Sequence, residues 1–76
     1  MSYPNNYITE IKTISSDDRS KTATIQILTE GKVDTLQVHC CTVIEGNRLE
    51  RMICLASTLD QANHIAEDFV YGILRG

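Results

Sequence analysis

The strongest constraint on this fold is a period-two alternation of apolar and polar residues, repeated in consecutive segments. Such alternation is typical of a β-strand with one buried face. The alternating segments are residues 21–29, 33–44 and 49–56. They are separated by two dipeptides that favour tight turns, Glu30-Gly31 and Gly46-Asn47. The pattern therefore predicts two successive β-hairpins.

A further strand and one helix flank the hairpins. Residues 7–14 are rich in isoleucine and threonine, which favours a strand although their isoleucines are spaced by three. Ser57 is a suitable helix N-cap, and Asp60 stands where the acid of a capping box belongs. The apolar stripe of the predicted helix consists of Leu59, Ala62, Ala66, Phe69, Val70 and Ile73.

This order of elements predicts an α+β fold: a four-stranded antiparallel β-meander with one C-terminal α-helix packed across one face (ββββα). A small sheet needs such a cover, because it is not stable alone. The chain of 76 residues has the length of a single small domain, residues 1–76. We expect the polar residues 1–6 to be flexible.

The two turns also predict a register between strands. A two-residue loop at Gly46-Asn47 gives the facing pairs Ile44–Leu49, Cys40–Ile53 and Val38–Leu55. A two-residue loop at Glu30-Gly31 gives the facing pairs Ile25–Leu36 and Ala23–Val38. Both registers gather the aliphatic residues on one face, which we expect to lie under the helix.

The opposite, outer face then carries a single charged residue, Glu50. A solvated sheet face usually carries more lysine and glutamate, so a neutral face favours contact with another protein or a second copy. The alternative is a threonine-rich, water-exposed face selected for strand propensity alone. The edge strand at residues 7–14 is a competing contact. The predicted partner-binding residues are Thr24, Gln26, Thr35, Gln37, His39, Cys41, Met52 and Cys54.

A second hypothesis comes from the His39-Cys40-Cys41 cluster. The same register brings His39, Cys41 and Cys54 together on the outer face, a ligand set that suits zinc or monovalent copper. The closely spaced cysteine pairs of common zinc sites are absent, and cysteine often serves only as a small apolar residue. A metal- or thiol-binding protein is therefore the alternative function, and the main interpretation includes no metal and no cofactor.

Other function classes lack the residues that they need. The four glycines are isolated, so there is no phosphate-binding loop. The net charge of −3 and an outer face without aromatics argue against a nucleic-acid partner. No apolar run approaches the roughly 20 residues that cross a membrane. Three cysteines, two of them adjacent, make a poor disulfide framework and indicate reduced thiols in a cytoplasm.

We therefore expect a small, acidic, non-enzymatic protein–protein interaction module in the cytoplasm. It would act as a homodimer or as an inhibitor or adaptor of a larger protein, as bacterial and phage regulators do. Small size and the elimination of other classes lead to this expectation, since an α+β fold by itself carries no function.

Overall fold

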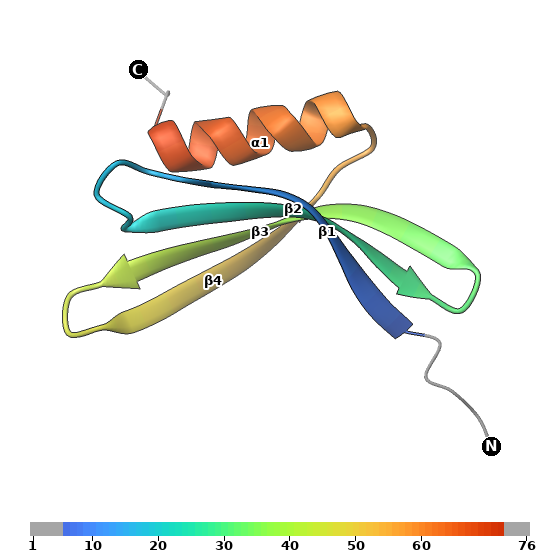
Figure 1. The fold of residues 1–76 in the computed structure, drawn as a ribbon, viewed down its shortest axis with the longest axis horizontal. Coiled ribbons are helices and arrows are strands. Elements are labelled where there is room, and N and C mark those ends of the chain that lie inside the picture. Colours follow the sequence, from blue (N-terminus) through green and yellow to red (C-terminus); the bar gives the residue numbers. More distant parts are fainter. Residues whose placement is uncertain (1–5, 73–76) are drawn as a thin grey trace.

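The computed structural model describes residues 6–72 and confirms the predicted ββββα fold. Its elements are β1 (Asn6–Ser15), β2 (Lys21–Glu30), β3 (Val33–Ile44), β4 (Arg48–Leu55) and α1 (Leu59–Tyr71). The strands form one antiparallel sheet in the order β1-β2-β3-β4, and α1 lies across one face of it (Figure 1). Residues 1–5 of the segment predicted to be flexible, and Ile73 of the helical stripe, lie outside the described residues.

The β2–β3 hairpin differs from the prediction by two residues but keeps its faces. Glu30 pairs with Val33, so the loop is Gly31-Lys32 and not Glu30-Gly31. Gly31 has a φ of 66°, as the first loop position of a type II′ turn requires. Because a shift of two residues restores the alternation, Ala23 still lies on the predicted face, now paired with Cys40.

The β3–β4 hairpin differs by one residue, and the predicted register is wrong. Ile44 pairs with Arg48, so the loop has three residues, 45–47, with Gly46 at φ 83° and Asn47 at φ 64°. A shift of one residue turns every side chain of the strand to the other face. The β4 residues on the inner face, the face on which α1 packs, are therefore Arg48, Glu50, Met52 and Cys54, and those on the outer face are Leu49, Arg51, Ile53 and Leu55.

The hydrophobic core lies between α1 and the middle of the sheet. Its buried members are Ala23, Ile25, Val38, Cys40, Ala62, Ala66 and Val70. The two alanines of α1 allow the helix backbone to approach the sheet closely. The helix packs mainly on β2 and β3, with fewer contacts to β1. Phe69 is only partly buried at the margin of this core, and Leu59, predicted to be in the stripe, is exposed.

The helix begins one residue later than predicted. The N-cap is Thr58, whose hydroxyl oxygen accepts a hydrogen bond from the backbone N–H of Gln61 at 3.1 Å. The Gln61 side chain in turn accepts from the backbone N–H of Ser57 at 2.7 Å, a close relative of the capping box. Gly72, in the left-handed region, ends the helix. Within residues 6–72, no helix is long and apolar enough to cross a membrane.

The two edge strands of the sheet differ. The β1–β2 register is interrupted between Glu10 and Lys12, so Ile11 forms a bulge in the β1 edge. The β3–β4 register runs without interruption from the Ile44–Arg48 pair to Gln37–Leu55. The edge of β4 is therefore regular, whereas that of β1 is broken.

Candidate interaction surface

A buried glutamine pair lies at the centre of the outer face. Gln26 on β2 and Gln37 on β3 face each other, and each side chain is only 5% exposed. The Nε2 of Gln37 donates a hydrogen bond to Oε1 of Gln26 at 2.8 Å. Buried amides need such partners. The two glutamine side chains are therefore shielded from solvent although they lie on the outer face, and they offer little surface to a partner.

The outer face is polar near the β1–β2 loop. The hydroxyl oxygens of Thr13 and Thr24 lie 3.2 Å apart, and those of Ser15 and Thr22 lie 3.4 Å apart. These cross-strand pairs are exposed, so water competes with them. This corner of the face matches the alternative expectation of a threonine-rich surface in contact with water.

The structure places six of the eight predicted partner-binding residues on the outer face. Thr24, Thr35, His39 and Cys41 are half-buried there, beside the buried Gln26 and Gln37. Met52 and Cys54 lie on the inner face, because the β3–β4 register differs by one residue from the predicted one. The prediction that the outer face carries only Glu50 as a charge is also wrong. Glu50 lies on the inner face, and Arg51 and Glu10 lie on the outer one.

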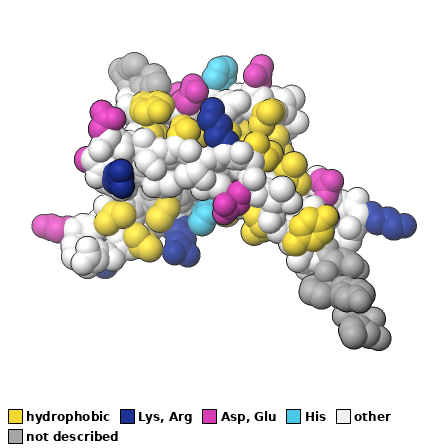
Figure 2. Space-filling view, in the orientation of Figure 1, with side chains coloured by type: hydrophobic (Ala, Val, Ile, Leu, Met, Phe, Trp, Pro, Cys, Tyr) yellow, Lys and Arg dark blue, Asp and Glu magenta, His cyan; other side chains and the backbone are white. Residues whose placement is uncertain are grey.

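Exposed apolar side chains lie at two places on the outer face: Ile8 and Val33 toward the β2–β3 hairpin, and a larger group along β4. We call this group the β4 patch, and it consists of Val43, Leu49, Ile53 and Leu55. Half of the Leu49 and Ile53 side chains and 67% of Leu55 are exposed. Hydrophobic side chains gather over the β3–β4 hairpin in the space-filling view (Figure 2). A patch of this kind marks a contact surface more often than scattered apolar residues do.

Sequence reasoning assigned the three leucine and isoleucine residues of this patch to the core. The missed signal was that β4 carries apolar residues at both even and odd positions, with Met52 on one face and Leu49, Ile53 and Leu55 on the other. A strand buried on one face does not need that pattern. A strand that is covered on both faces does.

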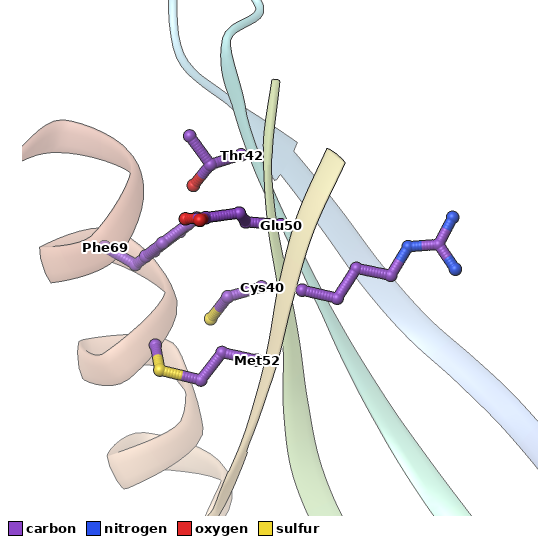
Figure 3. Close-up of a pocket in the computed structure, with 6 residues that line it drawn as sticks. Cys40, Thr42, Glu50, Met52 and Phe69 are labelled. Carbon is purple, nitrogen blue, oxygen red and sulfur yellow. The ribbon is translucent and has the colours of Figure 1, made fainter. Parts of the chain in front are cut away.

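On the inner face, an open groove of about 460 Å³ separates α1 from β4. Cys40, Thr42, Glu50, Arg51, Met52 and Phe69 line it (Figure 3). Figure 3 shows the Cys40 and Met52 sulfur atoms on the side of the sheet that faces the helix. The Nζ of Lys21 lies 5.8 Å from the centre of the Phe69 ring, a cation–π contact at the end of this groove. Met52 remains 51% exposed, so α1 does not cover the inner face of β4.

The cysteines are free thiols, and the structure pairs them differently from the sequence-based hypothesis. Cys40 and Cys54 are diagonal neighbours on the inner face, since Cys40 faces Met52 and Val38 faces Cys54. Burial raises the pKa of the Cys40 thiol to about 11, and the neighbouring Cys54 contributes to that rise. Cys40 therefore remains a neutral thiol near pH 7, which is the state of a packing residue rather than of a nucleophile.

The ligand set proposed for zinc or copper does not converge. His39 and Cys41 lie on the outer face and Cys54 on the inner one, so the sheet separates them. In the described part of the chain, no three or more histidine, cysteine, aspartate or glutamate side chains form a group that could hold a metal ion. The alternative hypothesis loses its site, and the β4 patch is the strongest remaining candidate.

Comparison of the chain with protein-family models, with curated proteins and with solved structures finds no match.

Proposed function

We propose that this protein is a small protein–protein interaction module that acts as a homodimer, and that the β4 patch is its contact surface. The observation that carries the proposal is the exposure of Val43, Leu49, Ile53 and Leu55 along the β4 side of the outer face. Burying this surface against a second copy would remove its apolar side chains from water, which favours association. The free thiols suit a reducing, cytoplasmic compartment.

The proposal differs from the sequence-based surface in its position. The surface predicted from the sequence includes Gln26 and Gln37, which are buried and satisfy each other. The β4 patch lies at the end of the same face, next to His39 and Cys41. A partner that covers the patch also reaches these two half-buried side chains.

The test is the mass of the protein in solution across a dilution series, measured by light scattering. We expect the wild-type chain to be a dimer and Leu49→Lys to dissociate it, because a charge buried at an interface is costly. Leu59→Lys is the matched control, since Leu59 is the same residue type with the same exposed fraction of 50% but lies on α1. A wild-type chain that stays monomeric at every concentration rules out the homodimer. The β4 patch would then bind a larger protein, in the role of an inhibitor or adaptor.

A further inference from the structure

We infer that two copies of the chain join through antiparallel β4–β4 pairing around a twofold axis at Met52, which makes one continuous eight-stranded sheet. This inference rests on the proposed homodimer and names its geometry. Three observations support it: the direction of the free backbone groups of β4, the charges along the strand, and the exposure of both of its faces.

The backbone groups on the free edge of β4 can be assigned from one hydrogen bond. The N–H of Ala56 donates to the carbonyl of Leu36 at 3.0 Å, and this pair continues the β3–β4 register. Hydrogen-bonded pairs alternate along an antiparallel ladder, so the even-numbered residues of β4 bond to β3. The residues whose N–H and C=O groups point to the open edge are Leu49, Arg51, Ile53 and Leu55.

Symmetry then limits the register. A twofold axis perpendicular to the sheet keeps inner residues on the inner face. One β4 residue must therefore lie directly opposite its own copy, with the axis between the two. An axis at Met52 pairs Leu49 with Leu55 of the second copy, and Arg51 with Ile53 of the second copy. The four residues of each chain whose backbone groups point to the open edge are then all paired. Each supplies one donor and one acceptor, so the dimer gains eight backbone hydrogen bonds.

The charges of β4 favour the same axis. An axis at Glu50 would place two glutamates opposite each other, and an axis at Arg51 would do the same with two arginines. Like charges directly opposite in a sheet are destabilising. An axis at Ile53 avoids both conflicts but leaves Leu49 outside the paired segment of β4. Met52 is therefore the only axis that pairs the full edge and opposes no like charges.

Edge pairing also explains why β4 exposes apolar side chains on both faces. A second sheet stacked on the outer face would cover Leu49, Ile53 and Leu55 but leave Met52, 51% exposed, in the open groove. A strand added beside β4 brings an outer leucine or isoleucine next to the β4 patch, and it brings a second Met52 next to the first on the inner face. One partner thus pairs with the edge and contacts apolar side chains of both faces.

The first test uses proline at an edge position. The N–H of Arg51 points away from β3, so Arg51→Pro removes an edge donor and leaves the β3–β4 ladder intact. We expect Arg51→Pro to raise the dimer dissociation constant at least tenfold, whereas Arg51→Ala, the matched control, leaves it within about threefold. A dimer that tolerates Arg51→Pro but is lost in Leu49→Lys would overturn edge pairing and leave the proposed function standing.

The second test measures the register. The two Met52 residues would form a pair without mutual backbone hydrogen bonds, with Cα atoms about 4.5 Å apart, within the range that a disulfide spans. In a background of Cys40→Ala and Cys41→Ser, Met52→Cys should form a reducible dimer under mild oxidation, linked between the two introduced cysteines. Leu59→Cys, at a site of nearly equal exposure, should not. Peptide mapping that instead finds the introduced cysteine linked to Cys54 of the second copy would place the axis at Ile53 and overturn the register.

Discussion

Replacing Gln37 by leucine should destabilise the fold, because it removes the donor that satisfies a buried amide. Gln26 Oε1 accepts from Gln37 Nε2 at 2.8 Å, and both side chains are 5% exposed. In residues 6–72 every buried side-chain nitrogen and oxygen atom has a hydrogen-bond partner. Gln37→Leu would leave Gln26 Oε1 without this donor, which costs about 1–3 kcal/mol.

That loss is large for a chain of 76 residues. Domains of this size lose roughly 4–8 °C of melting temperature for each kcal/mol, so Gln37→Leu should lower the melting temperature by at least about 4 °C. Replacing both partners removes the unsatisfied group, and such a change can be nearly neutral. The double variant Gln26→Leu with Gln37→Leu should therefore recover most of the lost stability.

The assay is a double-mutant cycle from urea unfolding curves followed by circular dichroism. All four proteins are compared at one concentration, because the proposed dimerisation would make apparent stability concentration-dependent. Thr13→Val is the matched control, since its hydroxyl contact with Thr24 is exposed and its loss should stay within about 0.5 kcal/mol. A coupling energy near zero between the two glutamines would show that water reaches the pair and that the centre of the outer face is open.

Two further predictions concern the inner face and the β1–β2 loop. Phe69→Ala should cost about 1.5–3 kcal/mol, less than for a fully buried phenylalanine, because Phe69 is only partly buried beside the groove; an unchanged unfolding curve would contradict its packing against the core. The pKa of Asp18 is lowered from 3.8 to about 2, because its carboxylate accepts hydrogen bonds from the Ser20 backbone N–H and from the Ser20 and Ser16 hydroxyls. Its stabilising contribution is therefore present above about pH 4 and lost as the pH falls through 2. A carboxyl titration by NMR that gives an ordinary pKa for Asp18 would contradict this loop geometry, and Asp18→Asn should remove that part of the acid dependence.

The strand and helix segments could be predicted because local patterns determine them. Alternation over residues 21–29 and 33–44 identified β2 and β3, and the helical spacing of Ala62, Ala66 and Val70 identified α1. The β2–β3 loop lies one residue later than predicted, which shifts the pairing of the two strands by two residues. The predicted faces of both strands are therefore still correct. Patterns of this kind survive small errors in loop position.

The register of β4 could not be predicted for two physical reasons. Gly46 and Asn47 both adopt positive φ, which suits a two-residue type I′ loop as well as the three-residue loop that forms. Alternation usually resolves that ambiguity, but β4 carries apolar residues at both parities. Because of the same one-residue difference, Met52 and Cys54 lie outside the predicted partner-binding face, and the three proposed metal ligands do not lie together. The position of the candidate surface therefore depended on one loop residue.

The two edge strands of this sheet differ in regularity and in how far the single helix covers them. A helix is about 10–12 Å across and strands lie about 4.8 Å apart, so α1 covers two strands well and cannot cover four. It lies over β2 and β3 and reaches β1, which leaves the inner face of β4 open. The β1 edge is interrupted by the bulge at Ile11, which discourages pairing with another strand. The β4 edge is regular and exposes apolar side chains on both faces, Met52 on the inner one and Leu49, Ile53 and Leu55 on the outer one, which is costly for an isolated chain in water. A second β4 in the antiparallel direction offers the same row of donors, acceptors and aliphatic side chains in reverse order. The strand that the helix leaves open is therefore the one at which we propose that a second copy pairs.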